Sequence, residues 1–248
     1  MVKVIQLEEV DSTNSYGKKH IDEFEDKTAI ITKKQTSGRG RLNRSWVDLG
    51  EENLFLSIIL KPSETFNEIY PNLTQYLSVT LCKVIESYGV QTQIKWPNDV
   101  LIDGKKIAGI LSETVMQGQK LKGIVLGVGV NLNSNQEKIN AIPNKIATSL
   151  NIETQKAIDL KEFLNKLLTE FFEHYDEFLQ SGFLQIKDDY IKRNCFLGKE
   201  LKVQVFNHME SGLAKAVNDL GELVLEDNNK REIVLTIGDI IWTIWKTD

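Results

Sequence analysis

The sequence has only two cysteines, Cys82 and Cys195, and their spacing matches neither a metal site nor a redox pair. This scarcity excludes a disulfide framework and favours a reducing, cytoplasmic setting. No apolar run is long enough to cross a membrane, and the first residues lack the apolar region of a signal peptide. Positive charge is not in excess, because the formal net charge is −5, which argues against a general nucleic-acid-binding protein. The 248 residues favour one large domain, or one large and one small domain.

Against this background one stretch stands out, the segment QTSGRGRLNRSW from Gln35 to Trp46. Its three arginines fall within six residues, beside two glycines: Arg39, Arg41, Arg44, Gly38 and Gly40. Arginine presents a planar fork of donors to carboxylates and phosphates, and glycine lets the backbone approach a ligand closely. Neighbouring cations repel one another unless an anion joins them. We therefore interpret the segment as an anion clamp that orders around its ligand, rather than as a solvated basic turn.

Hydroxyl and amide side chains precede the first predicted helix, which ends near Phe24. They are Ser12, Thr13 and Asn14, after Asp11. Such residues cap helices, because their side-chain oxygens accept hydrogen bonds from unpaired backbone N–H groups. They could equally bind a small polar ligand, and one side chain does only one of these jobs well. The residues alone leave both interpretations open.

Hydrophobic periodicity predicts alternating strands and helices in the first part of the chain. The expected strands are 2–7, 28–32 and 53–60, and the expected helices are 66–88, 160–179 and 183–193. The third strand is nearly continuous in apolar residues, which is typical of a strand buried on both faces. The helix predicted over 160–179 carries an aromatic stripe that is more typical of a core than of a cofactor site. The polar segment 134–145 is expected to be a loop.

The motif KWPNDV begins at Lys95, at the end of a strand predicted over 91–96. Pro97 cannot donate to a ladder, so the strand ends there. A turn explains Asn98 and Asp99 but not the lysine and tryptophan before them. A hairpin signal follows, with Asp103-Gly104 at its turn.

Two glycines, Gly127 and Gly129, lie inside a strand predicted over 121–132. Glycine costs stability within a strand unless something packs closely against the backbone. A ligand or a crowded helix could do so. Asn131 stands at the end of this strand, next to the loop.

Beyond Gly198, short strands follow one another at close spacing, with turns between them. This pattern predicts a small β-barrel. We place the domain boundary near Cys195, which gives domains of residues 1–195 and 196–248. Trp242 and Trp245 are expected in the barrel core or in the packing between domains.

Taken together, the motifs resemble the biotin protein ligase family, the biotin–[acetyl-CoA-carboxylase] ligases, over essentially the whole chain. The matching motifs are EVDSTN, QTSGRGRLNRSW, KWPNDV, KKIAGIL with Glu113 after it, GVGVNLN, DLGELVLE and GDII. Their order and spacing together make the resemblance specific. It implies an α+β fold. A catalytic domain like that of class II synthetases has helices covering one side of a mixed β-sheet, and a small SH3-like β-barrel forms the C-terminal domain.

The resemblance also implies a reaction in two steps, with biotin, ATP and Mg²⁺. The biotin carboxylate attacks the α-phosphate of ATP, giving biotinyl-5′-AMP and pyrophosphate. A lysine of a biotin carboxyl carrier domain, from acetyl-CoA carboxylase or pyruvate carboxylase, then attacks the mixed anhydride. Unit charges about 4 Å apart repel by roughly 4 kcal/mol near a protein surface, and the arginines answer that problem.

Roles carry over to the matching residues as follows. The implied biotin contacts are Ser12, Thr13, Asn14, Gln35, Gly38, Arg39, Gly40, Arg41, Lys106 and Gly109. The implied ATP or adenylate contacts are Arg41, Arg44, Trp46, Lys95, Asn98, Asp99, Lys106 and Asn131. Lys106 and Arg41 would be catalytic, and Asp99 would contact magnesium. Gly109, Gly127 and Gly129 would admit the ligand to the sheet.

The sequence departs from some family members in two places. Some carry an N-terminal DNA-binding domain, but here the motifs begin at Glu9, so we expect no operator binding. Some carry an arginine after the GDII-like segment that reaches ATP, but here Trp242-Thr243-Ile244-Trp245 follows, so we assign the barrel no ATP contact. Many relatives pair through sheet edges, which makes a homodimer a further expectation.

Two other functions fit parts of the pattern. A lipoate or octanoate ligase shares the fold and the adenylate chemistry, but a fatty chain needs no polar Ser-Thr-Asn-Gln wall. A non-catalytic sensor on the same scaffold could lose Lys106, Arg41 and Asp99, and all three are retained here.

Overall fold

The computed structural model describes residues 2–42, 44–50, 52–142 and 146–241. Seven strands form a mixed sheet in the order β1-β2-β3-β7-β6-β5-β4. They are β1 Lys3–Val10, β2 Thr28–Gln35, β3 Leu54–Leu60, β4 Gln93–Lys95, β5 Asp99–Ile102, β6 Lys105–Gln117 and β7 Lys120–Val130. β1 and β2 run parallel, and the remaining pairs are antiparallel. The predicted α+β class with a mixed sheet is confirmed.

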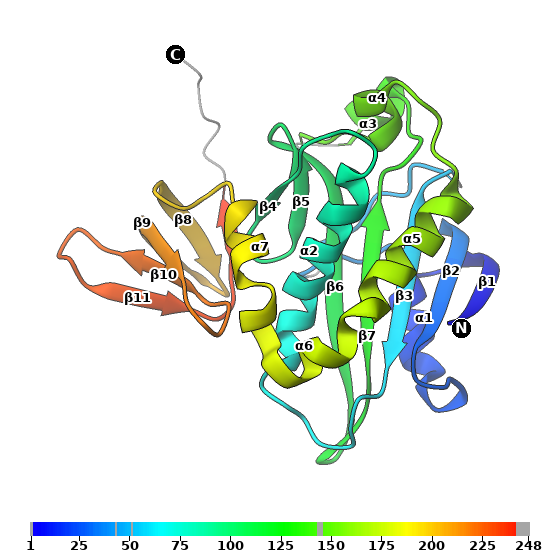
Figure 1. Cartoon of the computed structure of the whole chain (residues 1–248), viewed down its shortest axis with the longest axis horizontal. Coiled ribbons are helices and arrows are strands. Elements are labelled where there is room, and N and C mark those ends of the chain that lie inside the picture. Colours follow the sequence, from blue (N-terminus) through cyan, green and yellow to red (C-terminus); the bar gives the residue numbers. More distant parts are fainter. Residues whose placement is uncertain (1, 43, 51, 143–145, 242–248) are drawn as a thin grey trace.

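Helices connect these strands and extend beyond them. They are α1 Thr13–Lys19, α2 Leu73–Glu86, α3 Gln136–Asn140, α4 Leu150–Thr154, α5 Leu160–Glu173, α6 Tyr175–Ser181 and α7 Lys187–Lys192. Figure 1 shows α2, α5, α6 and α7 as a layer in front of the sheet, with α1 behind it. No helix among the described residues has the length and apolar character that a membrane span requires.

The two faces of the sheet bury different residues. Leu56 and Ile58 of β3 join the main core beneath α2, whereas Ile59 packs into a smaller cluster with Ile21 and Phe24, after α1. Side chains alternate between faces along a strand, so α1 must lie on the face opposite α2. The expectation that helices cover only one side is therefore wrong. α1 covers part of the second face and leaves the rest of it to a cavity.

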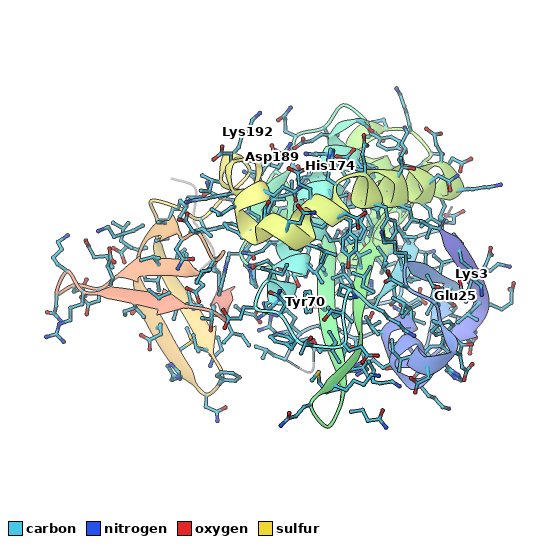
Figure 2. The ribbon with its side chains drawn as sticks, turned by 60° about the horizontal axis from the view of Figure 1, so that its bottom comes forward. Lys3, Glu25, Tyr70, His174, Asp189 and Lys192 are labelled. Atoms are coloured by element: carbon cyan, nitrogen blue, oxygen red, sulfur yellow. The ribbon has the colours of Figure 1, made fainter. Side chains whose placement is uncertain are left out.

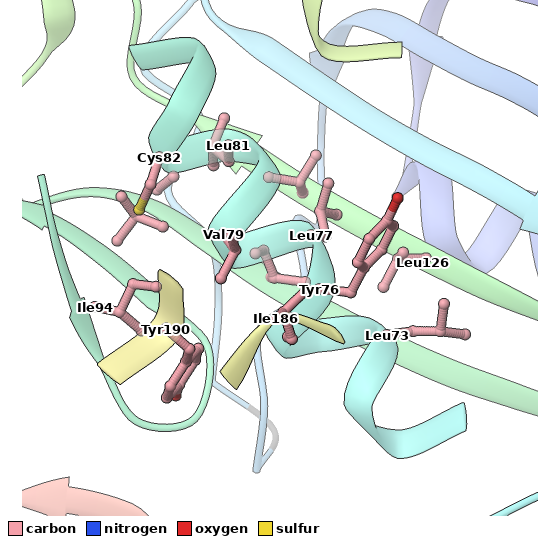
Figure 3. Packing of buried hydrophobic residues seen from close by; sticks show 14 of the residues in the cluster. Leu73, Tyr76, Leu77, Val79, Leu81, Cys82, Ile94, Leu126, Ile186 and Tyr190 are labelled. Atoms are coloured by element: carbon pink, nitrogen blue, oxygen red, sulfur yellow. The ribbon is translucent and has the colours of Figure 1, made fainter. Parts of the chain in front are cut away.

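The main core is built around α2. Figure 3 shows Leu73, Leu77 and Leu81 along this helix, with Ile94, Leu126 and Tyr190 from neighbouring elements. Cys82 is fully buried here, and burial raises the pKa of its thiol to about 12. The prediction that Cys82 is a core residue is confirmed.

Several predicted elements differ from the structure, among them helix 183–193, which begins as a 3₁₀ turn over Gly182–Gln185 and continues as α7 only from Lys187. Helix 66–88 begins only at Leu73, after a 3₁₀ turn over Tyr70–Asn72 that contains a proline. Helix 160–179 is divided at His174, which ends α5 and precedes α6. This bend lets Phe171 and Phe178 pack around one ring, that of Tyr76, with centroids 5.0 Å and 4.5 Å away. The expected loop 134–145 contains α3, and its residues 143–145 lie outside the described ranges.

Figure 2 shows His174, Asp189 and Lys192 on the outer side of the helical layer. About half of the His174 side chain is exposed, as the sequence predicted for a residue off the aromatic stripe. We therefore assign it no role in the site.

A five-stranded antiparallel sheet follows at one end of the molecule, in the order β11-β10-β9-β8-β12 (Figure 1). Its strands are β8 Glu200–Val205, β9 His208–Val217, β10 Leu223–Glu226, β11 Glu232–Leu235 and β12 Asp239–Ile241. The predicted run of short C-terminal strands is confirmed. The boundary near Cys195 stays a prediction, and Trp242 and Trp245 lie outside the described residues.

A turn of this C-terminal sheet docks on the larger sheet through Trp96. The indole Nε1 donates to the carbonyl of Gly221 at 3.1 Å, and Gln75 Nε2 donates to the same oxygen at 2.7 Å. Asn72 Nδ2 donates to Leu220 O at 2.9 Å. Trp96 is 2% exposed. The tryptophan of KWPNDV thus anchors the C-terminal sheet, and Lys95, Asn98 and Asp99 of the same motif line the cavity.

Candidate functional site

A cavity of about 1230 Å³ lies on the sheet face that α1 only partly covers. All the residues expected to contact biotin or ATP line it, with the exception of Gly38. Its floor is made by cross-strand partners that point to one face. Ser57 pairs with Gly127, Gly127 with Leu111, and Gly129 with Gly109. The structure therefore brings the predicted residues together in one place.

A polar wall closes one end of the cavity, with residues from α1, β2 and β3. The backbone N–H of Thr13 donates to Gln35 Oε1 at 2.9 Å. Asn14 Nδ2 donates to Leu111 O at 3.1 Å and to Glu113 Oε2 at 3.0 Å. All four predicted wall residues, Ser12, Thr13, Asn14 and Gln35, are at most 9% exposed. The wall is built of neutral polar side chains and is preorganised by its own hydrogen bonds.

Ser57 supports this wall through hydrogen bonds without lining the cavity itself, and its sequence context did not single it out. Its Oγ lies 2.6 Å from Asn14 Oδ1 and 2.8 Å from Thr13 Oγ1, and it is fully buried. The available signal was a single hydroxyl within the apolar strand NLFLSIIL. A buried polar side chain is expected to have hydrogen-bond partners, so that serine pointed to a polar neighbour on the same face.

The two interpretations of the segment before α1 can now be separated for one residue. Ser12 occupies the N-cap position, but its side chain makes no capping hydrogen bond. It is 3% exposed and lines the cavity. The geometry favours the ligand-binding interpretation for Ser12.

The strand glycines make room for side chains of the protein itself. A Cβ at Gly127 would lie 2.0 Å from Asn14 Oδ1, and a Cβ at Gly129 would lie 2.4 Å from Trp46 Cε2. At Gly109 the nearest atom would be Trp46 Cζ3, at 2.9 Å. All three glycines also line the cavity, and the expectation that they admit the ligand to the sheet stays a prediction. They seat the polar wall and the Trp46 indole, which in turn shape the cavity.

The arginine segment folds back on itself. Trp46 N donates to Gly38 O at 2.9 Å, Gly40 N donates to Arg44 O at 2.7 Å, and Arg39 forms a bridge with Ser45. A Cβ at Gly38 would lie 2.5 Å from Trp46 O, so only glycine fits there. Gly38 thus serves the shape of the segment rather than the lining of the cavity.

Protein carboxylates balance the three arginines. Arg39 Nη2 lies 3.2 Å from Glu113 Oε1, and Asp239 contacts both other guanidinium groups, with 2.9 Å to Arg41 Nη1 and 2.9 Å to Arg44 Nη1. Burial lowers the pKa of Arg41 below its ordinary value, and Asp239 opposes that effect. The sequence indicated that an anion must join these cations. In the structure the carboxylates of Glu113 and Asp239 do so.

Lys95, Asp99 and Lys106 form a charged group beside the arginines. Lys106 Nζ donates to Asp99 Oδ1 at 2.5 Å and lies 5.5 Å from the centroid of the Trp46 ring. Lys95 Nζ lies 3.9 Å from Asp99 Oδ2. Burial lowers the pKa of Lys95, and the charge of Asp99 partly restores it.

Magnesium was expected at Asp99. Mg²⁺ takes oxygen ligands in near-octahedral geometry and is bound through carboxylates and substrate phosphates. Among the described residues no group of three His, Cys, Asp or Glu side chains gathers to hold a metal. Asp99 itself lies between two ammonium groups. As it stands, this carboxylate does not fit a magnesium ligand.

The two asparagines expected on the nucleotide side are held by backbone. Asn98 Nδ2 donates to Ile110 O at 2.8 Å, which aims its Oδ1 at Arg41 Nη1, 3.2 Å away. Asn131 Nδ2 donates to Thr148 O at 3.0 Å. Asn98 thus orients an arginine, and Asn131 ties the end of β7 to the segment before α4.

Comparison with known protein families matches residues 7–131 to the biotin/lipoate A/B protein ligase family. The chain is also 30% identical over 223 residues to the biotin–[acetyl-CoA-carboxylase] ligase of Mycobacterium tuberculosis, covering 87% of this chain and 79% of that protein. The chain belongs to the biotin/lipoate A/B protein ligase family. The family match includes every residue predicted for the site, whereas Asp239 lies outside it.

Further members of this family extend the comparison. The bifunctional ligase/repressor BirA of Bacillus subtilis is 33% identical over 202 residues, which cover 81% of this chain and 62% of that protein. The chain therefore spans about three fifths of the length of that relative. The structure of the biotin protein ligase from Aquifex aeolicus in complex with biotin and ATP is similar, with a TM-score of 0.80, 28% identity, and coverage of 97% of this chain and 98% of that one.

Proposed function

We propose that this chain activates biotin with ATP and transfers the biotinyl group to a lysine of a biotin carboxyl carrier domain. The observation that carries the proposal is one cavity with two unlike ends. Neutral polar side chains of Thr13, Asn14 and Gln35 line the same cavity as the cationic groups of Arg41 and Lys106. The neutral polar side chains suit the polar head group of an acid. The cationic groups suit its carboxylate and the phosphates of a nucleotide.

The polar wall supports biotin over a fatty acid. A urea carries two N–H donors and a carbonyl acceptor, and each buried group left unpaired costs about 1–3 kcal/mol. The Gln35 amide and the Ser12 hydroxyl offer donors and acceptors at fixed positions, whereas Asn14 uses both of its amide N–H groups within the protein and offers only its Oδ1 as an acceptor. A lipoyl or octanoyl chain would leave these groups facing methylenes, which disfavours the sister activity.

The cationic end supports formation of an acyl adenylate. The carboxylate oxygen of biotin attacks the α-phosphorus, the bond to the bridging oxygen breaks, and pyrophosphate leaves with that electron pair. Lys106 and Arg41 would offset the repulsion between the carboxylate and the phosphate and stabilise the charge that develops. The carrier lysine amine then attacks the acyl carbon, and AMP leaves.

Transfer is tested with a carrier domain of acetyl-CoA carboxylase, biotin, ATP and magnesium. Intact-mass measurement should show one biotinyl group added to the carrier, and none when its acceptor lysine is replaced by arginine. Lipoate and octanoate, supplied in place of biotin, should give no addition. Addition of lipoate or octanoate alone would move the chain to the sister activity. Tight binding of biotin without any transfer would favour a sensor.

Partners beyond this carrier remain predictions. Pyruvate carboxylase is a second candidate carrier. β1 forms one edge of the seven-stranded sheet and, among the described strands, pairs only with β2. That edge is the surface on which the expected homodimer would form.

We expect alkaline pH to weaken ATP binding through Lys95. Its pKa is lowered by burial, so the ammonium is lost on raising the pH at a value below the 10.5 of an ordinary lysine. Asp99 raises this pKa, together with Asp239 and Cys195, while Lys106 lowers it. KM for ATP should therefore increase towards high pH, and Asp99→Asn should move the increase to lower pH. A Lys95→Gln variant that keeps the same increase would contradict the assignment.

A further inference from the structure

We propose that Asp239 is a positioning residue for the nucleotide half of the site and acts through Arg41 and Arg44. This inference rests on the proposed function and deepens it, because it names what holds the arginines in place. Asp239 begins β12 in the C-terminal sheet, outside the region that matches the family, and it is 7% exposed.

Arg41 is held through one nitrogen. Its Nη1 donates to Asp239 Oδ1 at 2.9 Å, to Gly238 O at 3.1 Å and to Asn98 Oδ1 at 3.2 Å. None of these contacts occupies Nη2 or Nε, and Arg41 lines the cavity. Such contacts fix the guanidinium plane and leave part of its fork of donors for a phosphate.

Arg44 is tied to the same carboxylate. Its Nη1 lies 2.9 Å from Asp239 Oδ2 and forms an ion pair with it. The angles of this contact are not those of a hydrogen bond, and among the described residues no other group donates to this buried oxygen. About half of the Arg44 side chain is exposed, so little else packs around it. One carboxylate therefore keeps two cations together that would otherwise repel each other.

The position of this carboxylate is itself set by the fold. Asp239 pairs with Gln204 of β8, and a Cβ at Gly238 would lie 2.6 Å from Val203 Cγ1, so β12 lies close against β8. The hydrogen bonds from Trp96 and Gln75 to Gly221 dock the whole sheet. Asp239 thus comes from a strand that is fixed relative to the cavity.

The test uses the full chain and compares Asp239→Asn with the wild type in biotin-dependent ATP–pyrophosphate exchange. We expect KM for ATP to rise roughly tenfold to hundredfold, because hydrogen bonds to charged groups are among the stronger ones. The biotin dissociation constant, measured without ATP, should stay unchanged. Glu200→Gln, an exposed change in the same sheet, is the matched control and should alter neither value.

A second comparison separates positioning from a general effect on the C-terminal sheet. If Asp239 acts through the arginines, Asp239→Asn should raise KM for ATP less in an Arg44→Gln background than in the wild type, since the two changes share one interaction. Full additivity, equal losses for biotin and ATP, or an Asp239→Asn chain that does not fold would each contradict the proposal. Absence of exchange in the wild type would instead contradict the proposed function.

Discussion

Replacing Lys106 with alanine is expected to slow adenylate formation by roughly two to three orders of magnitude, the usual loss when one preorganised charge-stabilising donor is removed. Lys106 Nζ lies against Asp99 and over the Trp46 ring, in the cationic end of the cavity. Its side chain is 27% exposed, so its removal leaves no large void. The measurement is the single-turnover rate of biotinyl-adenylate formation, with circular dichroism to verify the fold.

Lys105 provides the matched control for this variant. It precedes Lys106 on β6, pairs with Glu153 and is partly exposed. Glu153 is only 13% exposed but keeps its hydrogen bond from Thr148 when the lysine is removed, so Lys105→Ala should keep both the fold and the rate. If Lys106→Ala retained the wild-type rate, or if Lys105→Ala lost as much, the catalytic assignment of Lys106 would be wrong.

Gly127→Ala is expected to abolish most biotin binding. The added methyl group would lie 2.0 Å from Asn14 Oδ1, so Asn14 must leave its place in the wall. Asn14 is 3% exposed and hydrogen-bonded to Leu111 O and Glu113, which leaves it little freedom to adjust. Calorimetry should show the biotin dissociation constant raised by about tenfold or more, the equivalent of one lost hydrogen bond to a buried group.

Gly129→Ala, two residues along the same strand, is the internal control. Its methyl group would lie 2.4 Å from the Trp46 indole, on the adenylate side. This variant should raise KM for ATP while biotin binding without ATP is retained. Both variants overpack the same strand and should lose similar stability in thermal unfolding. Equal loss of biotin and ATP binding in both would contradict the division of the cavity into two ends.

Much of this site could be predicted from the sequence because its residues lie in short motifs. The arginine segment, KWPNDV and the strand glycines are each contiguous, and each residue type limits the chemistry it can perform. The β5–β6 hairpin followed from Asp103-Gly104, and the end of β4 followed from Pro97. These features depend on local geometry, which a few neighbouring residues determine.

The residues that escaped prediction depend on contacts between distant parts of the chain. Asp239 is 198 positions from Arg41, and nothing in GDII indicates which cation it meets. Glu113 was visible only as part of a motif, and its partners Arg39 and Lys18 come from other elements. For the same reason, the sequence did not identify the side chains that pack over Gly127 and Gly129. Sequence showed that something must pack there, and only the fold shows that Asn14 and Trp46 do.

Biotin-dependent ATP–pyrophosphate exchange tests the central claim most directly. With magnesium present, labelled pyrophosphate should enter ATP only when biotin is added, and neither lipoate nor octanoate should replace it. That result would establish that the polar wall and the cationic end of this cavity act together on one acid. Exchange with lipoate or octanoate but not with biotin, or no exchange with any of the three acids, would contradict the account.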